Sequence, residues 1–104
     1  MDSTKLARMF KLMSVDTRVR MIQLLKRRCL CVNALAHSLE LTPAAVSQHL
    51  RVLRDAGIVA ADKRGYFVHY RINEKALARW REAADGLLRT QESQLAGRTM
   101  ENSA

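Results

Sequence analysis

The sequence predicts a mainly α-helical domain that carries one β-hairpin. Apolar residues recur at helical spacing over most of the chain, and residues 32–57 contain two short helix patterns joined by a tight break. Residues 58–72 change character and favour strands. A length of 104 residues suits one domain. So small a domain buries a modest core, so that pairing with a second copy would help it.

Two helices are expected before the central motif. Leu6, Met9, Phe10 and Met13 recur at i, i+3, i+4 and i+7, which predicts a helix over residues 3–13. Asp16 is expected to be the N-cap of the second helix. The apolar side chains that this second helix turns inward are Val19, Ile22 and Leu25.

The central stretch predicts a helix-turn-helix. Its first helix ends at Glu40-Leu41, Thr42 can cap the next one, and Pro43 fits the first helical position. Gly57 closes that second helix. Val46, Leu50 and Leu53 mark its buried face. Its other face carries small or hydrogen-bonding side chains that suit base edges and phosphates, namely Ala44, Ala45, Ser47, Gln48 and Arg51. An ordinary helical hairpin is the alternative.

Residues 58–72 predict a β-hairpin with a basic tip. Two strand-forming runs flank the turn cluster Lys63-Arg64-Gly65. A basic hairpin directly after a recognition helix is typical of the wing of a winged helix-turn-helix, whose tip can reach phosphates or the minor groove. A solvated turn that happens to be basic is the alternative, mainly for Lys63.

A last helix is expected to begin at Asn73 or Glu74. Its apolar stripe consists of Leu77, Trp80, Ala84, Leu87, Leu88 and Leu95. The first and last helices together carry more apolar surface than a small core needs, so part of it should form a dimer interface. We expect one DNA-binding and dimerisation domain over residues 1–96, followed by a polar tail over 97–104.

The amino-acid composition indicates which class of partner the protein binds. The formal net charge is +8 and the pI is near 10.3, which favours a polyanion, above all nucleic acid. A membrane surface fits less well because the cations are spread over several elements. No apolar run approaches the ~20 residues of a membrane span, and the N-terminus has no signal-peptide pattern. The two cysteines, two positions apart, form no disulfide framework, so a reducing cytoplasm is expected.

The sequence contains no catalytic motif that would favour an enzyme over a nucleic-acid-binding protein. The sequence has no Gly-rich phosphate loop, G-x-S-x-G or H-E-x-x-H, so we expect no enzyme. A winged helix used for protein contacts or for RNA remains an alternative. A sharp, salt-sensitive preference for one short duplex would distinguish the DNA-binding regulator.

The segments FKLMSVDTRVRMIQLL, VSQHLRVLRDAG and KRGYFVHYRI resemble the ArsR/SmtB family of bacterial winged-helix repressors. The resemblance runs from about Phe10 to Trp80. It rests on the D-x-R start of the second helix, on S-x-H-L-x-x-L in the recognition helix and on G-x-x-x-x-Y in the wing. The residues of these motifs are Asp16, Arg18, Ser47, His49, Leu50, Leu53, Gly65 and Tyr70.

The resemblance implies a homodimer, joined through its first and last helices, that represses transcription and in many members leaves DNA when a metal ion or metalloid binds. A two-fold dimer should read an inverted repeat. The residues expected to contact DNA are Thr42, Ala44 and Ala45 at the groove-entering end, Ser47, Gln48 and Arg51 on base edges, His49 on phosphate or in a structural role, and Lys63 and Arg64 on the backbone.

The family's thiolate site is matched only in part. Metal sensors of the family carry C-V-C-D-L, where this chain has Cys31-Val32-Asn33-Ala34-Leu35, with Cys29 as an extra cysteine. Two thiolates suit a soft ion such as arsenite, cadmium, lead or zinc, although a closed site needs three or four ligands. In a helix the two sulfurs would diverge, so they converge only if Cys29 precedes the helix.

Other interpretations of the cysteines remain open. Neighbouring cations would make the thiols more reactive, yet a disulfide across one residue is strained. The cysteines could also be structural, and the inducer a small metabolite or absent. The family's other metal site, on the last helix, is expected to be missing, because Glu82 and Asp85 stand there without histidine. None of His37, His49 and His69 is expected to be a metal ligand.

Overall fold

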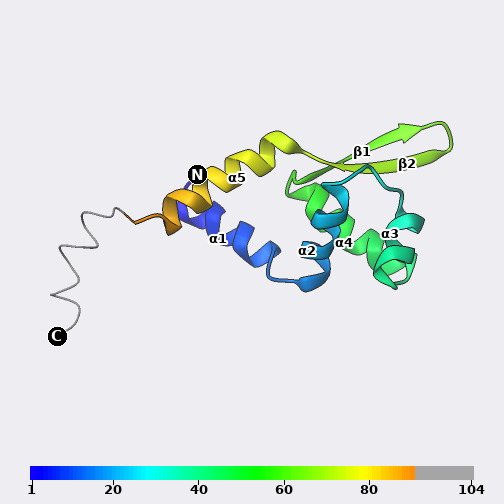
Figure 1. The fold of residues 1–104 in the computed structure, drawn as a ribbon, viewed down its shortest axis with the longest axis horizontal. Helices are drawn as coiled ribbons and strands as arrows, with labels where there is room; N and C mark the ends of the chain where they lie inside the picture. Colours follow the sequence, from blue (N-terminus) through cyan, green and yellow to red (C-terminus); the bar gives the residue numbers. More distant parts are fainter. Residues whose placement is uncertain (91–104) are drawn as a thin grey trace.

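The fold is a helical domain with one projecting hairpin (Figure 1). The computed structural model describes residues 1–90. Over these residues the elements are α1 (Ser3–Leu12), α2 (Asp16–Leu25), α3 (Val32–Leu39), α4 (Pro43–Asp55), β1 (Val59–Arg64), β2 (Phe67–Ile72) and α5 (Glu74–Leu88). The predicted winged helix-turn-helix is confirmed. Leu95, the boundary at residue 96 and the tail lie outside the described residues.

The core forms where α2, α3 and α4 meet the base of the hairpin. Met21, Leu35 and Leu53, one from each helix, are completely buried. The other buried apolar residues are Ile22, Leu25, Leu30, Ala36, Leu39, Val46, Leu50, Ile58, Val59 and Ile72. Helix α4 is therefore held by one face only, and its opposite face is free.

Two helix ends set the position of α4. Before it, Glu40 adopts a left-handed conformation (φ 56°), and the Leu41 N–H donates to the Ala36 carbonyl at 3.0 Å. The tight turn requires this left-handed backbone, which costs a non-glycine residue roughly 1–2 kcal/mol. After α4, Gly57 has φ 77° and the Ile58 N–H donates to the Leu53 carbonyl at 2.9 Å, which is the predicted glycine closure.

The hairpin turn is displaced from its predicted place. Gly65 has φ 62° and forms a two-residue turn with Tyr66, since a glycine at the first turn position accepts the left-handed backbone. Lys63 and Arg64 therefore lie at the end of β1, not in the turn as predicted, and pair with Val68 and Phe67. Both cations remain exposed.

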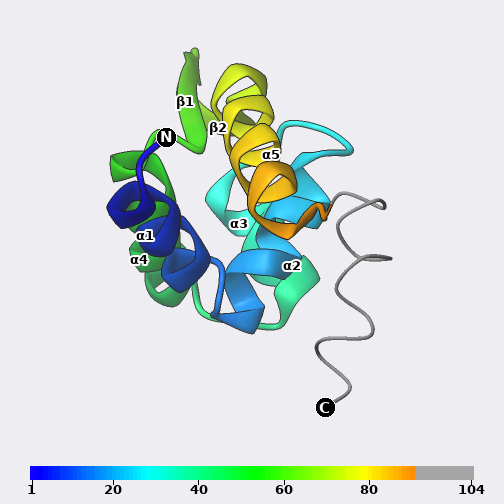
Figure 2. The same cartoon turned by 90° about the vertical axis from the view of Figure 1, so that its left-hand side faces the viewer.

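Helices α1 and α5 lie side by side at the end of the molecule away from the hairpin tip (Figure 1). The rings of Phe10 and Trp80 meet edge to face, with centroids 5.7 Å apart. Seen from that end, α3 and α4 lie behind these two helices (Figure 2). Neither α1 nor α5 contributes a fully buried side chain, which leaves apolar surface on both.

The predicted cap of α2 is wrong, whereas the predicted start of the last helix is confirmed. The N-cap of α2 is Val15, whose backbone is extended and whose side chain cannot accept a hydrogen bond, so Asp16 is already the first helical residue. Its carboxylate still favours the positive end of the helix dipole. At α5 the Asn73 side chain accepts from the Ala76 N–H at 3.3 Å. Within residues 1–90, no helix has the length and apolar character needed to cross a membrane.

Candidate nucleic-acid interface

Helix α4 presents a row of polar side chains opposite its anchored face. Val46, Leu50 and Leu53 are at most 1% exposed. The exposed residues on the helix are Ala44, Ser47, Gln48, Arg51 and Arg54, with Asp55 and the two end residues Thr42 and Pro43. The arrangement allows a helix to enter a groove without displacing the core that supports it.

The first turn of α4 is organised by Thr42. Its Oγ1 accepts from the Ala45 N–H at 3.1 Å, and Pro43 follows at the first helical position. The hydroxyl of Thr42 is thus engaged in the cap, although the residue is exposed. Ala44 is exposed as predicted, whereas Ala45 is partly covered. The exposed surface of this end of the helix therefore comes mainly from Thr42, Pro43 and Ala44.

His49 lies apart from the exposed row. It is half-buried, and its Nδ1 accepts from the Arg18 Nε at 3.3 Å. Arg18 also donates through Nη1 to the Leu12 carbonyl at 3.3 Å. The pair links α4 to α2 and to the end of α1. This geometry favours the structural role for His49, and it identifies Arg18 as a positioning residue.

A groove of about 540 Å³ separates α4 from β2. Its lining residues are Ser47, Leu50, Arg51, Arg54, Asp55 and Tyr70. Arg54 was missed by the sequence analysis, although its spacing of three from Arg51 and seven from Ser47 is a helical signal for the same face. Two guanidinium groups beside a groove suit a phosphate backbone that passes between helix and wing.

The wing adds positive charge beyond this groove. Lys63 and Arg64 are exposed near its tip. Farther down, Arg71 Nε lies 2.8 Å from Asp62 Oδ2 across the two strands, and the two side chains are 47% and 39% exposed. This ion pair contributes little to stability. It does neutralise Arg71, so the unpaired positive charge of the wing concentrates toward the tip.

The two cysteines precede α3 in extended backbone. Leu30 between them exchanges two backbone hydrogen bonds with Tyr70, at 3.1 and 2.8 Å. Cys31 is the N-cap of α3, with φ −83° and ψ 169°. Both cysteines therefore precede the first residue of α3, so Cys29 lies outside the helix, as the convergence of the two thiols requires. Both cysteines are free and half-buried.

No third ligand joins the cysteines within residues 1–90, where no cluster of three or more His, Cys, Asp or Glu side chains could hold a metal ion. Among the other histidines, His37 is exposed. His69 is half-buried, and its Nδ1 has no hydrogen-bond partner in the described part of the chain. The donor set therefore offers a soft ion two thiolates at most, with any further ligand coming from elsewhere.

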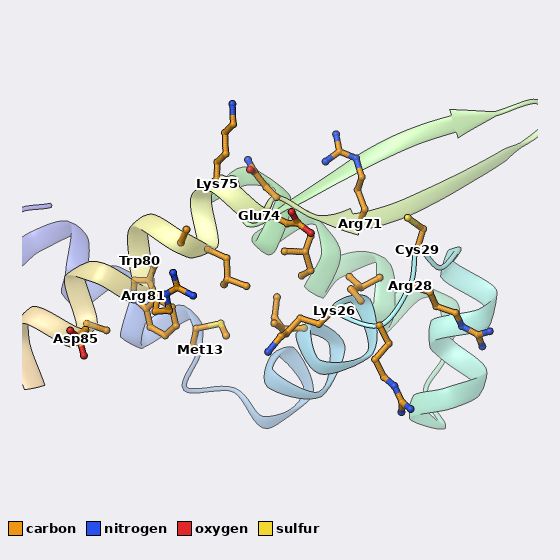
Figure 3. A pocket seen from close by; sticks show the side chains of 18 of the residues that line it. Met13, Lys26, Arg28, Cys29, Arg71, Glu74, Lys75, Trp80, Arg81 and Asp85 are labelled. Carbon is orange, nitrogen blue, oxygen red and sulfur yellow. The ribbon is translucent and has the colours of Figure 1, made fainter.

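A larger cavity, of about 1070 Å³, lies between α2 and α5 (Figure 3). Cys29 lies at the end beside the hairpin, and Trp80 and Asp85 lie at the other end, where α5 approaches α1. Apolar side chains such as Ile22, Leu77 and Leu88 line it. Trp80 Nε1 is buried without a partner in the described residues.

Comparison with known proteins shows which protein family this chain resembles. Residues 16–61 match the family described as "Bacterial regulatory protein, arsR family". A cadmium resistance transcriptional regulatory protein, a CadC homolog of Staphylococcus aureus, is 37% identical over 87 residues, which cover 75% of this chain and 72% of that protein. The chain belongs to the arsR family. The assignment makes it a DNA-binding transcriptional regulator and not an enzyme.

Two further proteins support the assignment to the arsR family. The arsenic resistance transcriptional regulator ArsR1 of Pseudomonas putida is 41% identical over 71% of this chain, but the match spans only 58% of that protein's length. A crystal structure described as a "possible transcriptional regulator for arsenical resistance" superposes with a TM-score of 0.71 at 35% identity, covering 86% of this chain and 93% of the other.

The homodimeric winged helix-turn-helix DNA-binding domain of a Mycobacterium bovis protein, described as a "possible ArsR-family transcriptional regulator", is also similar. It superposes with a TM-score of 0.66 at 25% identity, and the match covers 86% of each chain. The arsR fold therefore occurs as a homodimer in at least one structural relative.

Proposed function

We propose that this protein is a homodimeric cytoplasmic repressor that binds an inverted-repeat operator and leaves it when an inducer binds. The observation that carries the proposal is the exposed face of α4, with Ser47, Gln48 and Arg51 opposite a completely anchored side. Gln suits adenine and Arg suits guanine in the major groove. Lys63 and Arg64 then contact the DNA backbone from the wing.

We expect Gln48→Ala to weaken binding to the cognate operator by ~1–3 kcal/mol and to relax preference at one base pair of each half-site. The reason is that the side chain is exposed and lies in the middle of the face that enters the groove. Fluorescence anisotropy on duplexes selected from a random library, and on scrambled duplexes, measures both effects.

Lys11→Ala, an exposed change on α1, is the control and should leave both affinities unchanged. Equal weakening on cognate and scrambled DNA would mean that Gln48 positions the helix without reading bases. Failure of the wild-type chain to select any duplex would contradict the proposed function itself.

Dimerisation is supported by the apolar surface that α1 and α5 leave uncovered. Leu87 and Leu88 are 59% and 71% exposed, and Phe10 at the adjoining helix is 36% exposed. The apolar lining of the α2–α5 cavity continues toward this surface. A second copy would cover these side chains and place two α4 helices for half-sites about one helical turn, ~34–36 Å, apart.

The inducer site that we propose consists of Cys29 and Cys31. Two thiolates in the segment that precedes α3 suit a soft ion such as arsenite, cadmium, lead or zinc, with a further ligand recruited from outside the pair. The segment is attached to α3 on one side and to β2 through Leu30 on the other. Ion binding can therefore displace the helix-turn-helix relative to the wing. Oxidation of the same thiols is the second route to release.

We expect the double variant Cys29→Ser, Cys31→Ser to bind operator normally and to ignore the inducer. Release requires that the ion bind the DNA-incompetent state more tightly, because equal affinity for both states shifts nothing. Operator affinity is measured with arsenite, cadmium, lead, zinc and a mild thiol oxidant, each added separately.

The wild-type chain should lose affinity with at least one of these and the double variant with none. Ser38→Ala, which removes an exposed hydroxyl from α3, is the control that keeps both thiols. Full wild-type affinity under every addition would make the cysteines structural and would direct the search to small metabolites.

A further inference from the structure

The tip of the wing carries two adjacent aromatic residues whose side chains are mostly exposed. Tyr66 is 100% exposed and Phe67 is 65% exposed, and Val68 beside them is 39% exposed. Val68 follows Phe67 directly in β2, so its side chain points to the other face of the hairpin. Tyr66 and Phe67 therefore form the wing-tip patch. Large apolar side chains gathered at the far end of a hairpin, away from any core, mark a contact surface.

The residues around the wing-tip patch indicate which kind of molecule it contacts. Lys63 and Arg64 lie on the same tip, and Arg64 pairs directly with Phe67 across the strands. At the base of the hairpin, the groove lined by Arg51, Arg54 and Tyr70 connects the wing to the exposed face of α4. Cations beside aromatic rings, continuous with a DNA-reading helix, suit double-stranded DNA.

We propose that Tyr66 enters the DNA minor groove beside the half-site that α4 reads, while Phe67 packs against the adjoining deoxyribose. This inference rests on the proposed function and names further residues that determine its specificity. The minor groove is only about 6 Å wide. The backbones of two paired strands are already about 4.8 Å apart, so the hairpin with its side chains is wider than the groove. The hairpin backbone stays outside, and one side chain at the two-residue turn reaches in.

The chemistry of the phenol gives the contact a base preference. In the minor groove, A·T pairs present only the acceptors adenine N3 and thymine O2, to which the Tyr66 hydroxyl can donate. A G·C pair adds the guanine N2 amino group, which projects into the groove and obstructs the ring. The tip therefore favours A·T pairs at positions that α4 does not reach.

The test uses a duplex selected by the wild-type chain from a random library. At the flanking positions that the wing faces, each A·T pair is replaced by G·C and then by inosine·C, which lacks the N2 amino group. We expect G·C to lower wild-type affinity about tenfold, and inosine·C to restore it. Tyr66→Ser should bind all three duplexes with equal affinity, close to that of wild type on G·C.

The dependence on salt separates this contact from a phosphate contact. An apolar contact releases no counterions, so Tyr66→Ser and Phe67→Ser should lower affinity without changing the slope of log K against log salt. Arg64→Ala is the matched control on the same tip, and it should flatten that slope by roughly one unit per contact. Thermal unfolding verifies that all three variants stay folded.

Each result decides between distinct conclusions. Unchanged discrimination between A·T and G·C in Tyr66→Ser, or no restoration by inosine, overturns the minor-groove contact while leaving the operator function intact. A Tyr66→Ser chain with wild-type DNA affinity but a changed oligomeric state assigns the patch to protein contact and overturns the inference. A wild-type chain that selects no duplex overturns the proposed function together with the inference.

Discussion

Leu53→Ala should lower the free energy of unfolding by about 2–5 kcal/mol, the largest effect on stability that we expect from one substitution in α4. The Leu53 side chain is completely buried where α4 meets the rest of the core, and its carbonyl accepts the hydrogen bond that closes the helix. Close packing leaves a cavity when the side chain is shortened, because the neighbours relax only in part.

Urea denaturation measures this effect, with a lower midpoint at an unchanged slope. Both chains are compared at one protomer concentration, since dimerisation adds to apparent stability. Arg51→Ala, on the exposed face of the same helix, is the control and should stay within about 0.5 kcal/mol of wild type. Equal losses in the two variants would contradict the assignment of the anchored and exposed faces of α4.

The second large effect concerns the dimer. We expect the double variant Leu87→Gln, Leu88→Gln to bind an inverted-repeat operator at least about 100-fold more weakly, because linked binding sites commonly gain a factor of 10²–10⁴. Both leucines are exposed near the end of α5. Glutamine keeps the helix propensity and adds no charge, so that only the apolar contact is lost. Affinity for a single half-site should not change.

Sedimentation and anisotropy measurements test the two parts separately. Glu82→Gln is the control, since residue 82 lies on the opposite side of α5 from residues 84, 87 and 88. If the double variant remained dimeric, the interface would lie elsewhere. If it became monomeric and still bound the repeat as tightly as wild type, the two-fold interpretation of the operator would be wrong.

The core of the DNA-binding motif could be predicted because its signals are local. Thr42-Pro43 starts α4, Gly57 ends it, and Val46 recurs with Leu50 and Leu53 on one face. Each signal depends on neighbours within two helical turns. The errors were also local. Asp16 was expected as a cap where Val15 holds the extended backbone, and Lys63 and Arg64 were placed in a turn that Gly65 begins.

The sequence by itself determined the fold class, the positive charge, the helix-turn-helix with its predicted recognition helix and the presence of two neighbouring thiols. Only the tertiary structure decided which side chains remain available for function. Arg18 reaches His49 from 31 positions away and donates a hydrogen bond to its Nδ1. Leu30 pairs with Tyr70, which extends the cysteine segment. Tyr66 has strand-forming chemistry typical of a packed residue, yet it is completely exposed. The exposure of a side chain and the pairing of residues far apart in the sequence depend on which distant segments pack together. A local sequence pattern does not specify that packing.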